Sequence, residues 1–188
     1  MTGQAQFPLF SRVLHWLMAA MIITMLFIGV AMVASLGHYY TLISVHRVLG
    51  ILILILVVVR IVNRWLNPPP PLPPMPRIQK IVAQGSHYLL YALMIIMPLV
   101  GWGMLSAARY PVEMVGSFVL PPILPHDPAL YAVLRRSHTV LAYVFFFTVL
   151  VHLGAALLHA LIIRDGVFAS MASWRRARAP VAAGSGHR

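Results

Sequence analysis

Residues 137–163, SHTVLAYVFFFTVLVHLGAALLHALII, decide the fold, because they run without a charged side chain for long enough to cross a bilayer. A helix rises about 1.5 Å per residue, and the hydrocarbon core of a membrane is roughly 30 Å thick. Three histidines interrupt this apolar run, at His138, His152 and His159. An imidazole inside a bilayer is costly, so each of them is a candidate functional residue.

Three more apolar stretches precede this one, over residues 14–36, 44–65 and 81–107. Only 9% of the 188 residues are charged and 61% are hydrophobic, whereas a soluble domain is roughly 25% charged. We therefore predict an all-α membrane protein, built as an antiparallel bundle of four transmembrane helices. Residues 7–170 are expected to form this single membrane domain, and residues 171–188 a basic, disordered tail.

The charge balance is strongly positive, with 14 basic residues against 3 acidic ones and a net charge of +11. The cations flank the apolar runs, so the expected partner is the anionic membrane surface rather than nucleic acid. The distribution of arginine and lysine near the ends of the spans predicts that both termini lie in the cytoplasm. The absence of cysteine excludes thiolate metal sites and covalent haem attachment.

The connections differ in character. Residues 68–76 contain seven prolines and are expected to be stiff and cytoplasmic. The connection over residues 108–136 is long and faces the other side, and its last part, residues 128–136, is predicted to be a short interfacial helix.

The spacing of the histidines suggests two stacked pairs. His138 and His152 are 14 residues apart, close to four helical turns, so they share a face about 21 Å apart. His46 enters its span from the same side as His138, and His15 enters from the opposite side. We therefore predict His46 with His138, and His15 with His152, as axial ligands of two non-covalent b-type haems.

Two alternatives stay open for these histidines. All four could simply form hydrogen bonds between helices. Counted from the charged ends of the spans, His159 also matches the depth of His15 better than His152 does. His159 lies about 31 Å from His138, however, which is too far for two haems stacked inside the hydrocarbon, and this favours His152.

Further polar residues accompany each predicted pair. Arg60 follows His46 by 14 residues, so it shares the face of His46 at the depth of the inner pair, where it could bind a haem propionate or extend to the interface. Arg47 stands beside the outer pair. His87, His159 and Lys80 lie towards the inner pair, where they could contact a quinone and its protons or form structural hydrogen bonds.

An ordered set of short motifs covers residues 10–170. It comprises Ser11-Arg12-x-x-His15-Trp16, His46-x-x-x-Gly50, Arg60-x-x-x-Arg64 with the proline run, Gly85-x-His87-x-x-x-Tyr91, Pro98-x-x-Gly101, His138, and His152-x-x-Ala155-Ala156-Leu157-x-His159. This set resembles the bacterial cytochrome b561 family of four-helix dihaem membrane proteins.

The resemblance implies that His15, His46, His138 and His152 are the axial ligands and that the protein exchanges electrons with membrane ubiquinone. In the best-understood type of member it implies oxidation of superoxide at the outer face. Outer cations would attract such an anionic donor; they are Arg47, Arg109, Arg135 and Arg136. One alternative is an electron-transfer subunit that docks a hydrogenase or dehydrogenase. Another is a haem-free transporter, which is disfavoured because no span contains an acidic residue.

Overall fold

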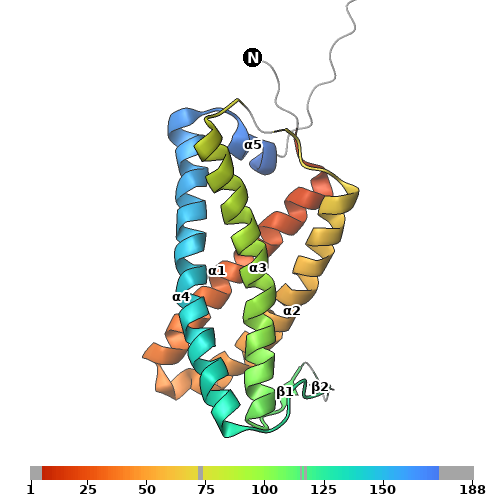
Figure 1. Cartoon of the computed structure of the whole chain (residues 1–188), viewed down its shortest axis with the longest axis vertical. Helices are drawn as coiled ribbons and strands as arrows, with labels where there is room; N and C mark the ends of the chain where they lie inside the picture. The colour runs from red at the N-terminus through yellow and green to blue at the C-terminus, as the bar shows by residue number, and fades with distance from the viewer. Residues whose placement is uncertain (1–5, 72–73, 115, 117, 174–188) are drawn as a thin grey trace, which may run out of the picture.

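Four long helices in up-and-down order make the body of the protein (Figure 1). The computed structural model describes residues 6–71, 74–114, 116 and 118–173. The helices are α1 (Leu9–Ala34), α2 (Tyr39–Leu66), α3 (Arg77–Ala107) and α4 (Pro128–Leu158). All four are long and apolar enough to cross a membrane. The prediction of an antiparallel four-span bundle is therefore confirmed. The predicted disordered tail was residues 171–188: Met171 and Ala172 instead belong to helix α5 (Val167–Ala172), and residues 174–188 lie outside the described residues.

The prediction of a separate interfacial helix over residues 128–136 is wrong. These residues form the first turns of α4, which continues unbroken to Leu158. The Asp127 carboxylate caps the helix by accepting hydrogen bonds from the backbone N–H groups of Ala129 (2.8 Å) and Leu130 (3.1 Å). Pro128 stands in the first turn, where its missing N–H costs nothing. The connection before α4 is correspondingly shorter than expected.

The two ends of the bundle carry different small elements. At one end, here called the hairpin end, lie the 3-10 turn η1 (Leu36–His38) and two short antiparallel strands, β1 (Val112–Glu113) and β2 (Val119–Leu120). At the other end, the α5 end, the chain leaves α4 through a π-helix, η2 (His159–Ile163), and forms α5 (Val167–Ala172). Figure 1 shows these elements at opposite ends of the long axis.

Helix α5 is attached to the beginning of α1. The indole Nε1 of Trp16 donates to the carbonyl of Met171 (3.2 Å), and the backbone N–H of Phe7 donates to the carbonyl of Ser170 (3.1 Å). The guanidinium of Arg12 donates to the carbonyl of Ser173. These bonds hold the segment after α4 against the N-terminal turns of α1.

The helices pack as two hairpins. Close backbone packing is extensive between α1 and α2 and between α3 and α4, and it is sparser between α2 and α3. The buried core is small and aliphatic, with Leu14, Met18, Val57, Leu93 and Phe145 among its members. Most other large apolar side chains point outwards, as a lipid-facing surface requires. The two predicted histidine pairs, described next, connect α2 with α4 and α1 with α4.

Candidate functional site

His46 of α2 and His138 of α4 face each other near the hairpin end. Their ring centroids are 6.2 Å apart, and the ring planes are tilted by 58°. Gly101 of α3 lies against the His138 ring, since a Cβ at that position would be 3.6 Å from the ring atoms Cδ2 and Nε2. The glycine therefore brings the backbone of α3 up to the imidazole, and the predicted partners are side by side.

Arg47, next to His46, forms a hydrogen bond with the connection between α3 and β1. Its Nη1 donates to the carbonyl of Pro111, which directly precedes β1, at 3.3 Å. The Nε of Arg47 and the Nδ1 of His46 are both buried and have no hydrogen-bond partner among the described residues. Buried polar atoms are nearly always satisfied in folded proteins, so these two atoms mark a position suited to an anion or a metal.

A second group of imidazoles lies towards the α5 end. His15 of α1 and His152 of α4 have ring centroids 6.4 Å apart, at an interplanar angle of 65°. His87 of α3 is a second neighbour of His152, and the centroids of these two rings are 5.4 Å apart. The structure thus brings the predicted pair together and adds His87 to it, a contact that its place in the sequence did not reveal.

Arg60 of α2 joins the same group. Its Nη2 lies 3.0 Å from the Nδ1 of His15, and its Nε donates to the hydroxyl of Tyr91 at 3.1 Å. A guanidinium has only donors, so in this contact the His15 Nδ1 accepts and the proton of the neutral ring is on Nε2. Coordination of a metal by Nε2 moves that proton to Nδ1. It would therefore release Arg60 to pair with an anion nearby.

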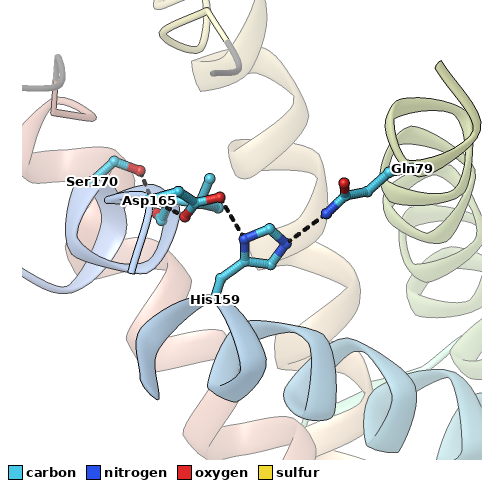
Figure 2. Close-up of polar contacts among 5 residues, drawn as sticks. Gln79, His159, Asp165 and Ser170 are labelled. Atoms are coloured by element: carbon cyan, nitrogen blue, oxygen red, sulfur yellow. Dashed lines mark hydrogen bonds and ion pairs between the residues drawn. The ribbon is translucent and has the colours of Figure 1, made fainter. Parts of the chain in front are cut away.

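His159 lies apart from these groups, at the α5 end. Its Nδ1 is 2.7 Å from the Oδ2 of Asp165, and its Nε2 is 3.4 Å from the amide nitrogen of Gln79 on α3 (Figure 2). Both ring nitrogens are engaged by other side chains, so His159 is not placed as an alternative partner for His15. Sequence reasoning missed Asp165 and Gln79, because neither stands at a helical spacing from His159.

The remaining predicted residues lie at the surface. Lys80 is exposed in the first turn of α3, towards the α5 end. Arg109, Arg135 and Arg136 are exposed near the hairpin end. Arg135 donates to the hydroxyl of Tyr131 (3.1 Å), and Arg109 takes a left-handed conformation (φ 60) directly after α3. The outer cations are thus grouped at one end of the bundle, as predicted from the order of the spans.

The residues present fit a b-type haem. A metal–imidazole bond of about 2 Å and roughly 1 Å from that nitrogen to its ring centre put two axial rings about 6 Å apart. Both histidine pairs have this spacing. Among the described residues, no group of three or more His, Cys, Asp or Glu side chains is arranged to hold a metal ion. A haem needs only two protein ligands, because the porphyrin supplies the others.

Comparisons with known proteins agree with this chemistry. The family model described as prokaryotic cytochrome b561 matches residues 6–174. The chain is 28% identical over 170 residues to cytochrome b561 homolog 2 of Escherichia coli, covering 88% of this chain and 90% of that protein. It is 26% identical over 173 residues to cytochrome b561 homolog 1 of the same organism, covering 87% and 94%.

A third relative, the probable superoxide oxidase CybB of Yersinia pestis, is 29% identical over 133 residues, which cover 70% of this chain and 75% of that protein. The family match spans all four helices and both histidine groups. The chain therefore belongs to the prokaryotic cytochrome b561 family of multi-pass membrane proteins, which bind b-type haem and transfer electrons.

Proposed function

We propose that this protein is a dihaem cytochrome of the bacterial inner membrane that passes electrons from superoxide at the hairpin end to ubiquinone at the α5 end. The observation that carries the proposal is the pair of matched histidine contacts at two depths, with ring centroids 6.2 Å and 6.4 Å apart. Bound haem supplies the one-electron chemistry, since its iron changes between two oxidation states.

The chain's own residues bind and orient these groups. His46 with His138 would hold one haem, and His15 with His152 would hold the other. The Nε of Arg47 would bind a propionate of the first haem, and Arg60, once released from His15, would bind a propionate of the second; the buried, unpaired Nε and the Arg60–His15 contact support these roles. His87, whose ring centroid lies 5.4 Å from that of His152, would line the second site beside the His15–His152 pair.

The two ends suit different reaction partners. The exposed arginines at the hairpin end would attract a small anion, and superoxide is one. His87, His159 and Lys80 lie in the half towards the α5 end, where imidazole and ammonium groups can bind and protonate a quinone. With both termini cytoplasmic, the hairpin end would face the periplasm. A relative named probable superoxide oxidase supports superoxide as the donor.

A stopped-flow experiment tests this function. Purified, oxidised protein is mixed with superoxide, and haem reduction is followed by absorbance; a short-chain ubiquinone is then added. We expect rapid reduction followed by reoxidation. Haems that stay oxidised in superoxide would overturn the superoxide assignment, and reduced haems that ubiquinone leaves unchanged would overturn the quinone assignment.

A second candidate is an electron-transfer subunit that docks a larger oxidoreductase. It is favoured by the apolar side chains exposed on the hairpin connection, among them Tyr110, Phe118 and Ile123, which are 43–62% exposed. Exposed apolar patches often mark protein interfaces. Reduction of the haems by a co-purifying hydrogenase or dehydrogenase, and not by superoxide, would establish this role instead.

A further inference from the structure

The turn after α4 has an uncommon backbone. The π-helix His159–Ile163 is followed by Arg164 in the left-handed region (φ 55) and by Gly166, also left-handed (φ 83). For a residue other than glycine this conformation costs roughly 1–2 kcal/mol. Short π segments and strained residues recur at functional sites, where surrounding contacts maintain them.

This turn brings Asp165 back to His159. On a regular α-helix, side chains meet at spacings of three and four residues, whereas these two are six apart. The Asp165 carboxylate divides its contacts: Oδ2 accepts from the His159 Nδ1 at 2.7 Å, and Oδ1 accepts from the backbone N–H of Val167 at 3.1 Å. The His159 and Asp165 side chains are only 14% and 21% exposed, so their interaction is partly shielded from water.

These contacts fix the tautomer of His159. The carboxylate can only accept, so the ring proton lies on Nδ1. On the opposite side of the ring, the Gln79 amide donates to Nε2 across a long 3.4 Å contact. Figure 2 shows the imidazole held between Asp165 and Gln79. Nε2 is thus left as an acceptor behind a weak, easily replaced donor.

An apolar groove of about 560 Å³ lies along the same two helices. It is lined by residues of α3 and α4 that include Ser86, Val144, Phe147 and Thr148. Ser86 is two turns from Gln79 on α3, and Thr148 is three turns from His159 on α4, so groove and imidazole occupy the same helix faces. This arrangement suits a molecule with a polar headgroup and a long apolar tail.

We propose that Asp165 is a positioning residue that holds His159 for proton transfer to the quinone headgroup. The inference rests on the proposed reduction of ubiquinone. Two superoxide ions are oxidised to two O₂, and the two electrons reach one quinone. For each of the two protons required, His159 takes one on Nε2 from water, pairs as imidazolium with the Asp165 carboxylate, and passes the Nε2 proton to a quinone oxygen. The product is the quinol.

A purely structural role for Asp165 predicts the opposite ranking of variants. Asparagine retains an oxygen that can cap the Val167 N–H, as it does at helix N-termini, whereas glutamate, with its longer side chain, caps poorly. A structural role therefore makes Asp165→Asn mild and Asp165→Glu harmful. The positioning role needs a negative charge, so it makes Asp165→Asn harmful and lets Asp165→Glu retain part of the rate.

The test uses full-length, haem-loaded protein that has been reduced with dithionite and freed of excess reductant. Reoxidation by short-chain ubiquinone is followed by stopped flow, and haem content is measured in parallel. General acid–base groups typically contribute about 10²–10⁴-fold. We expect at least about tenfold slower reoxidation in Asp165→Asn and in His159→Gln, full haem content in both, and no further loss in the double variant.

Asp127→Asn is the matched control, because it makes the same chemical change at the hairpin end, where asparagine still caps α4. It should reoxidise at the wild-type rate. The positioning role alone would be overturned if Asp165→Asn were reoxidised at the wild-type rate. It would also be overturned if Asp165→Asn were reoxidised faster than Asp165→Glu, as a structural role predicts. Wild-type protein that ubiquinone does not reoxidise would overturn the quinone function and the positioning role together.

Discussion

At the scale of single residues, Arg60 is the cation whose effect on the proposed second haem site, at His15 and His152, can be reasoned most directly. It lies within hydrogen-bond distance of His15 and is held in place by the hydroxyl of Tyr91. A positive charge beside an axial ligand or a propionate favours the reduced iron, which carries one positive charge less. Arg47 is the corresponding cation beside His46, 13 residues and about 20 Å away from Arg60 along α2, so each arginine should act mainly on its own site.

We therefore expect Arg60→Gln to lower the reduction potential of the haem at the α5 end by about 60 mV, equivalent to a tenfold change in a one-electron equilibrium. The haem at the hairpin end should change much less. Arg60→Lys keeps the charge and should shift the potential less than Arg60→Gln. Redox titration followed by absorbance measures both potentials, and equal shifts in both haems would show that Arg60 has no special relation to His15.

Four histidine variants test the pairing itself. His46→Ala and His138→Ala should each remove the same haem, whereas His15→Ala and His152→Ala should each remove the other. Wild-type protein should hold two haems per chain, both extractable because the chain has no cysteine. The pyridine haemochrome assay measures the number of haems per chain, and low-temperature spectra show which of the two haems a variant has lost. His87→Ala is the critical comparison. If His87→Ala loses a haem and His15→Ala keeps both, the partner of His152 is His87 and not His15.

At the scale of elements, the spacing along one helix was predictable, whereas the rotation of one helix against another was not. The 14 residues between His138 and His152 fix two depths on α4, and the direction of α1 and α2 then brings His15 and His46 to those depths. The face of α3 that points inwards depends on packing with α4. Therefore the contact of His87 with His152 was not predictable.

Local backbone departures explain what else was missed. The sequence predicted that the fourth span begins at Ser137. In the structure the helix is capped by Asp127 and begins at Pro128, nine residues earlier. The contact of His159 with Asp165 depends on a π-helix and a left-handed arginine, neither of which has a clear signal in the sequence. Periodicity finds residues on regular helices, and it fails where a turn is irregular.

Helix α3 offers a prediction at this scale, because Gly101 lets its backbone approach His138. Leucine at this position would add a side chain starting 3.6 Å from the imidazole. The Cβ alone would make ordinary van der Waals contact with the ring, but the larger branched end of leucine would compete with the ring for space. We expect Gly101→Leu to reduce occupancy of the haem at the hairpin end and to spare the other one.

Gly154→Leu is the control for that change. Gly154 lies on α4, and a Cβ there meets nothing within 4 Å, so leucine should point into the lipid. Reduced haem spectra of membranes and of purified protein distinguish the two variants. If Gly101→Leu keeps full occupancy at both sites, or if Gly154→Leu loses the same haem, close approach at Gly101 is not what shapes the site.

At the scale of the whole molecule, both ends of the bundle carry more cations than carboxylates, and the cations of the hairpin end lie near the His46–His138 pair. The hairpin end carries Arg47, Arg109, Arg135 and Arg136 against two carboxylates, Glu113 and Asp127. Exposed charges of one sign raise the local concentration of an oppositely charged reactant, and salt weakens this attraction over a Debye length of about 10 Å at 0.1 M. The arrangement therefore affects the rate of encounter with an anionic donor rather than the stability of the fold.

We expect reduction by superoxide to slow several-fold as ionic strength rises from about 0.01 M to 0.5 M, because the Debye length shrinks from roughly 30 Å to below 10 Å. The triple variant Arg109→Gln, Arg135→Gln, Arg136→Gln should be slower at low salt and nearly independent of salt. Arg77→Gln removes an exposed cation at the α5 end and should keep the wild-type dependence of the rate on salt.

Stopped-flow rates of haem reduction across a salt series measure this dependence, and a neutral quinol serves as a reductant that salt should not affect. A wild-type rate with superoxide that does not change with salt would mean that the arginines at the hairpin end do not steer the donor, and their grouping there would then reflect only the membrane interface.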